Sequence, residues 1–291
     1  MHYKKYKTIL SPKNGMNLYR GCTHGCIYCD SRSACYKMDH NFEDIEVKES
    51  APEILRREMA RKRKKCMIGT GAMCDPYMPI ENELCLTRRC LESIYEYGFG
   101  VAIQTKSAGI LRDIDLLAAI HKRTKCVVQM TLTTSNEDIC KLVEPNVSTT
   151  RERFEALMAF RERGVPTVVW LTPILPFIND TLDNARGLMD YCVRAGTRGV
   201  LYFGAGMTLR EGNREYFYSC LDKSFPGVKN KYVKRFGEAY ACFSEKSAAI
   251  SDCIIREAIR HGILFDQKDV FAYLHSFDHD NSINNPKQLS F

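Results

Sequence analysis

Strand-forming apolar stretches alternate with amphipathic segments along the first two thirds of the chain. Five strands are predicted, at 66–72, 101–106, 126–132, 167–171 and 199–203. Segments 51–64, 110–123, 149–164 and 181–196 carry apolar residues at helical spacing. With a short strand expected at 16–20, six strands alternate with helices. This pattern predicts an α/β fold, a partial (β/α)6 TIM-type barrel of parallel strands joined by right-handed crossovers.

The pattern changes after about residue 215. Residues 1–215 are expected to form the barrel, and residues 216–291 a mostly helical C-terminal extension that packs on it without being clearly a separate domain. This extension is rich in aromatic residues and ends in a predicted helix near 245–261. The last stretch, 278–291, is polar and is expected to fray.

The charge balance does not by itself indicate nucleic-acid binding. The net charge of +7 arises within residues 1–65, mostly in the run 56–65, and the rest of the chain is balanced. A solvated helix end accounts for such a run, because cations favour a helix C-terminus. No apolar stretch reaches the roughly 18 residues of a membrane span or resembles a signal peptide. We therefore expect a cytoplasmic protein with no membrane partner.

Three cysteines, Cys22, Cys26 and Cys29, stand in one short loop at 20–32, directly after the first predicted strand. Parallel α/β barrels place their chemistry at this carboxyl rim. Their spacing admits structural zinc, with His24 or Cys35 as a fourth ligand. It also admits an iron–sulfur cube in which one iron lacks a protein ligand. A third interpretation is three buried thiols with no further role, although two glycines beside them favour a close approach of the backbone to a bulky group.

With Tyr28 before the third cysteine, this loop resembles that of the radical S-adenosylmethionine (SAM) enzymes. The similarity is closer to the spore photoproduct lyase-like branch, also called DNA repair photolyases. It rests on the stretches "NLYRGCTHGCIYCDSR", "GAMCDPYMPIE", "TKSAGILRDIDLL", "VEPNVSTTRERFEAL" and "GVPTVVWLTPILPFIND". The resemblance implies that Cys22, Cys26 and Cys29 bind a [4Fe-4S] cluster, and that the amino and carboxylate groups of SAM occupy its open iron.

The chemistry implied by this resemblance is hydrogen abstraction. A reduced cluster, supplied by a one-electron donor such as flavodoxin or ferredoxin, cleaves SAM to methionine and a 5'-deoxyadenosyl radical. That radical removes a hydrogen atom from the substrate, which in this branch suggests a DNA lesion. Two alternatives remain open: the same chemistry on a peptide or small molecule, and a zinc-stabilised nucleic-acid-binding module without catalysis.

The resemblance also suggests further site residues, each with a simpler alternative. Tyr28 would lie near the SAM adenine or be a core aromatic, and Lys106 would pair with the SAM carboxylate or be a surface lysine. Thr131 matches a SAM-contacting serine or is an ordinary strand threonine, and Asp75 would hold the SAM ammonium or form a turn. Cys74 is the candidate hydrogen donor, or a buried cysteine. The branch carries its donor cysteine three residues before the aspartate, and that position is alanine here, which puts lesion repair in doubt.

Other residues stay undecided at this stage. Glu144 contacts substrate or shapes its loop, and Cys220, Cys242 and Cys253 lack the close spacing of a second cluster. Basic residues after strand six are candidates for contacting phosphates, and the aromatics among them could stack on bases or plug the barrel. These basic residues are Arg210, Arg214, Lys229, Lys231, Lys234 and Arg235.

Overall fold

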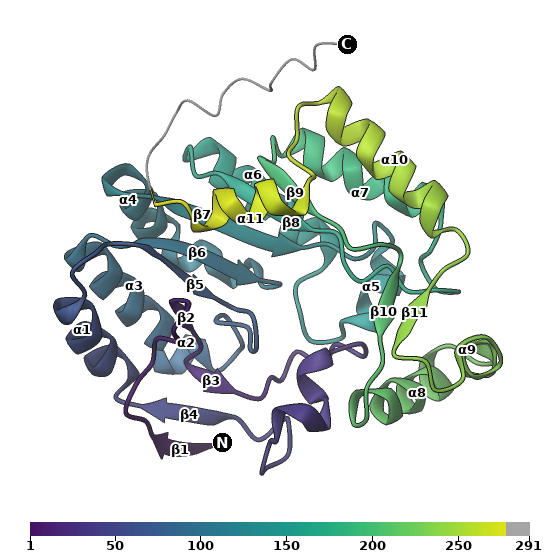
Figure 1. The fold of residues 1–291 in the computed structure, drawn as a ribbon, viewed down its shortest axis with the longest axis horizontal. Helices are drawn as coiled ribbons and strands as arrows, with labels where there is room; N and C mark the ends of the chain where they lie inside the picture. The colour runs from purple at the N-terminus through teal and green to yellow at the C-terminus, as the bar shows by residue number, and fades with distance from the viewer. Residues whose placement is uncertain (278–291) are drawn as a thin grey trace.

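The structure, a computed structural model, describes residues 1–277 (Figure 1). The expected fraying of 278–291 therefore lies outside the described residues. Six parallel strands form the central sheet in the order β2-β5-β6-β7-β8-β9. These are β2 (Gly15–Met16), β5 (Met67–Thr70), β6 (Gly100–Thr105), β7 (Cys126–Thr131), β8 (Thr167–Trp170) and β9 (Gly199–Leu201). The predicted partial barrel of six parallel strands is confirmed.

The first predicted strand, at 16–20, is divided between two sheets. Its beginning is β2 of the barrel, whereas its end is β3 (Tyr19–Arg20), which pairs antiparallel with β4 (Glu46–Glu49). Strand β4 in turn pairs parallel with β1 (His2–Lys5). Where the chain leaves the barrel, the carbonyl of Leu18 accepts a hydrogen bond from the Lys48 N–H at 3.1 Å. This small sheet then leads directly into the cysteine loop.

One face of the six-stranded sheet is covered by helices, and apolar side chains between them form the main core. The covering helices are α1 (Ala51–Arg61), α3 (Leu86–Tyr97), α4 (Ile114–Arg123), α6 (Thr150–Glu162) and α7 (Leu182–Arg194). Four of these were predicted, and α3 fills the connection between the second and third predicted strands. Helix α6 begins where Thr149 and Glu152 form a capping box. Short helices α2 (Glu81–Leu84) and α5 (Glu137–Val143) lie at the carboxyl edge.

The opposite, concave face of the sheet is closed only in its amino half. Helix α11 (Gln267–His275) lies across it (Figure 1), and Val270 and Leu274 pack against apolar residues of β5 to β9. The Phe271 ring of α11 lies 6.1 Å from that of Trp170, at the end of β8. Among residues 1–277, the apolar cluster under α11 includes no residue from the carboxyl ends of β5, β6 and β7.

The other helices of the C-terminal extension pack in two different regions of the molecule. Helix α10 (Ser247–Arg260), close to its predicted position, packs against α7 in the outer layer. Helices α8 (Asn213–Ser224) and α9 (Val228–Phe236) pack their aromatic residues against the cysteine loop. Strands β10 (Gly206–Thr208) and β11 (Ala241–Phe243) form an antiparallel pair that joins these parts.

The basic run 56–65 ends α1 and precedes β5, so it lies at the amino edge of the sheet, opposite the cysteine loop. Within the described part of the chain, no helix combines the length and apolar character that crossing a bilayer requires.

Gly71, just after β5, lies very close to the backbone of β6. Its φ is +97°, and a Cβ there would lie 1.9 Å from the carbonyl oxygen of Gln104. We expect Gly71→Ala to lower the free energy of unfolding by about 3 kcal/mol or more, because backbone strain and a steric clash add. Urea unfolding followed by circular dichroism measures this loss.

Gly164→Ala is the matched control. Gly164 has a similar φ of +68°, but nothing lies within 4 Å of the added Cβ. Strain alone should cost about 1–2 kcal/mol. Equal losses in the two variants would contradict the close approach at Gly71.

Candidate metal-cluster site at the carboxyl edge of the sheet

The cysteine loop needs its two glycines for contacts within the protein. Gly21 and Gly25 have φ values of +87° and +69°. A Cβ at Gly21 would lie 2.4 Å from the carbonyl oxygen of Phe42, and one at Gly25 would lie 3.1 Å from the side-chain nitrogen of Asn146. The Phe42 carbonyl also accepts the Cys22 N–H at 3.0 Å. The loop is therefore seated closely between two other segments of the chain.

Residues 143–146, which follow α5, hold this loop by its backbone. Ile27 N–H donates to the carbonyl of Val143 at 3.0 Å, and Asn146 N–H donates to the carbonyl of His24 at 3.2 Å. The Asn146 side chain adds a bond to the carbonyl of Thr23 at 3.0 Å. These bonds fix the backbone conformation between the first and third cysteines.

A buried ionic network lies beneath the same loop. The Tyr28 hydroxyl donates to Glu144, and Glu144 forms an ion pair with Arg153. All three side chains are buried. Arg153 also donates to the carbonyls of Thr131 at 2.8 Å and Ser148 at 2.7 Å. Burial alone would raise the pKa of Glu144, but Arg153 and Lys106 hold it below its usual value, so the carboxylate that the sequence left undecided serves to hold the loop.

Asp75 connects three parts of the carboxyl edge. Its carboxylate accepts bonds from the Tyr77 N–H at 2.9 Å, the Thr105 hydroxyl at 2.6 Å and the Lys106 N–H at 2.7 Å. The His24 ring nitrogen Nδ1 lies 3.5 Å from the same carboxylate. This is the turn-forming role considered from the sequence. Contact between Asp75 and the SAM ammonium stays a prediction.

Lys106 brings a cation to the cysteine loop. The side chain is partly buried, and its ammonium lies 6.0 Å from the centre of the Tyr28 ring. Burial would lower the pKa of Lys106, but the neighbouring Cys26, Glu144 and Asp75 raise it overall. Among residues 1–277, no group accepts a hydrogen bond from this ammonium. The site therefore offers a positive charge that is free to pair with an anionic group.

The two remaining predicted residues lie in different surroundings. Thr131 ends β7 and is directly paired with Trp170 of β8, so both belong to the concave face. The Cys74 thiol is buried and donates to the carbonyl of Tyr19 at 3.1 Å, on the side of the small sheet. Burial raises the pKa of Cys74 to about 12. The structure thus brings Tyr28, Asp75 and Lys106 to the cysteine loop, whereas the thiol of Cys74 points to the backbone of β3.

The spacing of the thiols distinguishes a cluster from a single ion. Around a tetrahedral zinc ion, thiolate sulfurs are about 3.8 Å apart, given a Zn–S distance of about 2.3 Å. Within residues 1–277, no three metal-ligating atoms that include a cysteine of this loop lie within 4.8 Å of one another. The proposed fourth ligands are also engaged elsewhere, His24 beside Asp75 and Cys35 with Arg210. A cube carries its thiolates on separate irons, so its ligands do not need to lie as close together as those of a single zinc ion.

Binding such a cluster also requires that the cysteine thiols of the loop lose their protons. Burial raises the pKa of Cys22 to about 12 and that of Cys26 well above its usual value. A metal deprotonates a coordinating thiol outright, so cluster binding releases these protons. The candidates for a second cluster are not gathered: Cys220 of α8 and Cys242 of β11 belong to the apolar cluster between these elements and the cysteine loop, and Cys253 lies in α10.

The sequence analysis did not predict the polar patch on the concave face, here called the polar floor, which consists of Gln104, Gln129 and Trp170. Gln104 and Gln129 are paired on β6 and β7, and the Trp170 indole donates to Gln129 at 3.0 Å. Nothing lies within 4 Å of a Cβ built on Gly69 of β5. Phe203 stands beside Trp170, with ring centres 5.8 Å apart. The sequence did contain a signal for this patch, because each of the mainly apolar strands 101–106 and 126–132 includes one glutamine.

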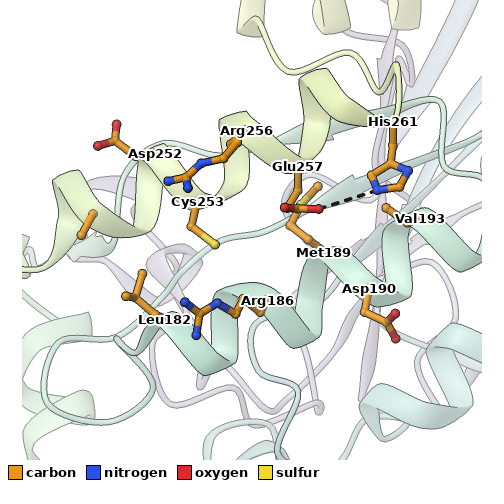
Figure 2. Close-up of a pocket in the computed structure, with 11 residues that line it drawn as sticks. Leu182, Arg186, Met189, Asp190, Val193, Asp252, Cys253, Arg256, Glu257 and His261 are labelled. Carbon is orange, nitrogen blue, oxygen red and sulfur yellow. Dashed lines mark ion pairs between the residues drawn. The ribbon is translucent and has the colours of Figure 1, made fainter.

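A separate groove of about 600 Å³ lies between α7 and α10 in the outer helix layer. Figure 2 shows its lining, with Arg186, Arg256 and Cys253 facing it and His261 paired with Glu257. No residue of the cysteine loop or its neighbours lines this groove. It therefore takes no part in the site described above.

Comparisons with known proteins agree with this geometry. The family model of the radical SAM superfamily matches residues 16–192. An uncharacterized protein of Methanocaldococcus jannaschii is 30% identical, covering 82% of this chain and 83% of that protein. An uncharacterized protein of Mycobacterium tuberculosis is 28% identical over 75% of this chain, which spans only 65% of that relative's length.

Among solved structures, spore photoproduct lyase complexed with dinucleoside spore photoproduct has a similar fold. The TM-score is 0.60 at 16% identity, covering 85% of this chain and 74% of that chain. At this identity the likeness concerns the fold alone.

Removing the charge of Glu144 should disrupt the support of the loop. In Glu144→Gln, Arg153 becomes an unpaired buried cation, so we expect the free energy of unfolding to fall by about 3–5 kcal/mol. Denaturant titration of the metal-free protein gives this value. The control is Glu155→Gln, because Glu155 pairs with Arg151 on the exposed side of α6 and should lose less than about 1 kcal/mol. A small loss in both variants would contradict the role of Glu144.

Proposed function

The chain belongs to the radical SAM superfamily, and we propose that it removes a hydrogen atom from a nucleic-acid base held on the concave face of its barrel. The cofactors of this family are a [4Fe-4S] cluster and SAM. When bound, they supply a 5'-deoxyadenosyl radical, and a one-electron donor such as a ferredoxin or flavodoxin supplies the electron. The residues of this chain bind and orient the reactants around that chemistry.

We infer that Cys22, Cys26 and Cys29 hold the cluster. Lys106 would pair with the SAM carboxylate, since its ammonium carries no hydrogen bond within the described residues. Asp75 supports this lysine by accepting its backbone N–H. Tyr28, whose hydroxyl donates to the buried Glu144, keeps the loop in place.

The polar floor of the concave face is the surface that would contact the substrate and determine which substrate binds. Amide groups recognise base edges through paired donors and acceptors, and aromatic rings stack on base faces. Gln104 of β6 and Trp170 of β8 offer both, with β7 between them, and β6 borders the strand whose Gly69 leaves open space above it. These residues share the carboxyl half of the sheet with Lys106, which stands two residues after Gln104, directly after the end of β6. A flat, hydrogen-bonding substrate suits this surface better than an aliphatic one.

The rim offers contacts for a phosphate backbone. Lys231 and Lys246 line a cavity of about 320 Å³ together with Phe177, which is 37% exposed, whereas Arg235 in the same lining pairs with Glu245. Arg214, by contrast, is buried and donates to the carbonyls of Leu209, just after β10, and of Gly237, just after α9, so it is not free for phosphates. The spore photoproduct lyase structure of similar fold holds a dinucleoside, which supports a nucleic-acid substrate for this chain as well.

The role of Lys106 can be tested apart from the cluster. We expect Lys106→Met to keep its iron but to bind SAM at least tenfold more weakly, because a hydrogen bond to a charged group is worth about 1.5–3 kcal/mol. Anaerobic equilibrium dialysis with labelled SAM gives the affinity, and iron analysis confirms the cluster. Lys122→Met, a change at an exposed position on α4, is the control. Unchanged SAM affinity in Lys106→Met would remove this assignment.

Isotope transfer identifies the substrate class. Anaerobic enzyme is incubated with deuterated oligonucleotides, peptides or metabolite fractions, and 5'-deoxyadenosine is analysed by mass spectrometry. We expect deuterium only from the nucleic acid. Trp170→Ala should lower this transfer by about 5- to 150-fold, the equivalent of 1–3 kcal/mol of base stacking, while SAM cleavage without substrate persists.

Tyr95→Ala, which removes an exposed aromatic of α3, should leave the transfer unchanged. Deuterium arriving from a peptide or a small molecule, and from no oligonucleotide, would replace the nucleic-acid hypothesis by the alternative substrate class.

A further inference from the structure

Two histidines and several carboxylates meet at the small sheet formed by β1, β4 and β3. His2 comes from β1, Asp39 and His40 from the loop before β4, and Glu46 from β4 itself. The His2 and His40 ring centres lie 4.7 Å apart. Each Nε2 atom lies close to one Glu46 oxygen, at 3.8 Å for His2 and 3.9 Å for His40. Ligand atoms of Asp39, His40 and Glu46 all lie within 4.8 Å of one another.

His40 is held in the orientation of a metal ligand. Its Nδ1 lies 3.0 Å from the carbonyl oxygen of Asn41, and because a carbonyl only accepts, Nδ1 carries the proton. The Nε2 atom then presents a lone pair, yet it is buried and has no hydrogen-bond partner among residues 1–277. The side chain as a whole is only 10% exposed. Metal-bound histidines are oriented in this way, through a backbone carbonyl or a carboxylate on the second nitrogen.

His2 and Glu46 complete the same pattern. The Nδ1 atom of His2 lies 3.0 Å from Asp44, which directs its Nε2 toward Glu46. Glu46 is fully buried, and one of its oxygens accepts the Tyr6 hydroxyl. The other oxygen is buried without a hydrogen bond of good geometry. Its nearest cation is the Lys4 ammonium at 3.0 Å, which also lies 3.4 Å from Asp39.

Lys4 thus places a positive charge where a metal ion would bind. We propose that His2, His40, Glu46 and Asp39 bind a divalent transition-metal ion, with zinc as the best match, and that the ion displaces the Lys4 ammonium. Imidazole nitrogens and carboxylate oxygens are ligands that zinc accepts, at about 2.0–2.2 Å. Tetrahedral zinc spaces such ligands about 3.4 Å apart, so the observed 3.8 and 3.9 Å need to close by about half an ångström.

The consequence of binding is structural. The loop that carries Asp39 and His40 also carries Phe42, whose carbonyl accepts the Cys22 N–H at 3.0 Å. Strand β4 pairs with β3, which leads into the cysteine loop. An ion that joins β1, this loop and β4 would therefore stiffen one side of the cysteine loop. The proposal does not depend on the proposed substrate.

Zinc uptake by the cluster-loaded full chain tests this site. Protein without a tag before Met1 is equilibrated with Zn²⁺, exchanged into buffer with a competing chelator, and analysed for zinc and iron. We expect one zinc ion per chain in addition to the cluster iron. The same stoichiometry is expected in a Cys22→Ser, Cys26→Ser, Cys29→Ser variant, in which thiolate binding is removed.

Single substitutions locate the ion. His40→Gln and Asp39→Asn should each weaken zinc binding at least tenfold, whereas Lys4→Met should strengthen it severalfold because the competing ammonium is gone. His261→Gln is the matched control, since His261 has a single carboxylate partner, Glu257, at 3.6 Å (Figure 2). Its zinc content should equal that of the unmodified chain.

Melting temperature provides a second readout that does not require the variants to retain zinc. Zn²⁺ should raise the melting temperature of the triple cysteine variant and should not do so once His40→Gln is added. If His40→Gln is poorly folded, Asp39→Asn, at an exposed position, serves the same comparison. Zinc content and melting shift that are equal with and without these substitutions would overturn the proposal.

Discussion

The site depends on the seating of the cysteine loop against residues 143–146. Two backbone hydrogen bonds fix the loop between its first and third cysteines, and the buried Tyr28–Glu144–Arg153 network lies underneath. A buried ion pair contributes little net stability unless all its groups are satisfied, but losing one partner is costly. Here Arg153 also holds the ends of β7 and of the following loop. The same interaction therefore fixes the cysteines relative to the sheet.

The two halves of the concave face of the sheet have different roles, one in packing and the other in the proposed chemistry. Helix α11 fills the amino half with apolar contacts, and the carboxyl half keeps glutamines, an indole and the open space above Gly69. Helices α8 and α9 cover the cysteine loop from the other side. The basic run 56–65 lies at the amino edge of the sheet. Most of the net positive charge of the chain is therefore remote from the proposed chemistry.

The sequence predicted the six parallel strands and the three cysteines, because apolar periodicity and motif spacing are local signals. It could not predict the break in the strand at 16–20, which depends on pairing between β3 and β4 across about 27 residues of chain. Glu144 was undecided because its partners, Tyr28 and Arg153, lie 116 and 9 residues away. The floor formed by Gln104, Gln129 and Trp170 likewise arises only when three strands align.

The central claim is that the three cysteines hold a cluster with one iron open to SAM. The most direct measurement is electron–nuclear double resonance of the reduced, anaerobic protein with SAM carrying ¹⁵N in its amino group and ¹⁷O in its carboxylate. The account predicts hyperfine coupling of both labels to the cluster, and its loss in Cys26→Ala. A cluster without such coupling, with every iron ligated by side chains, would contradict it.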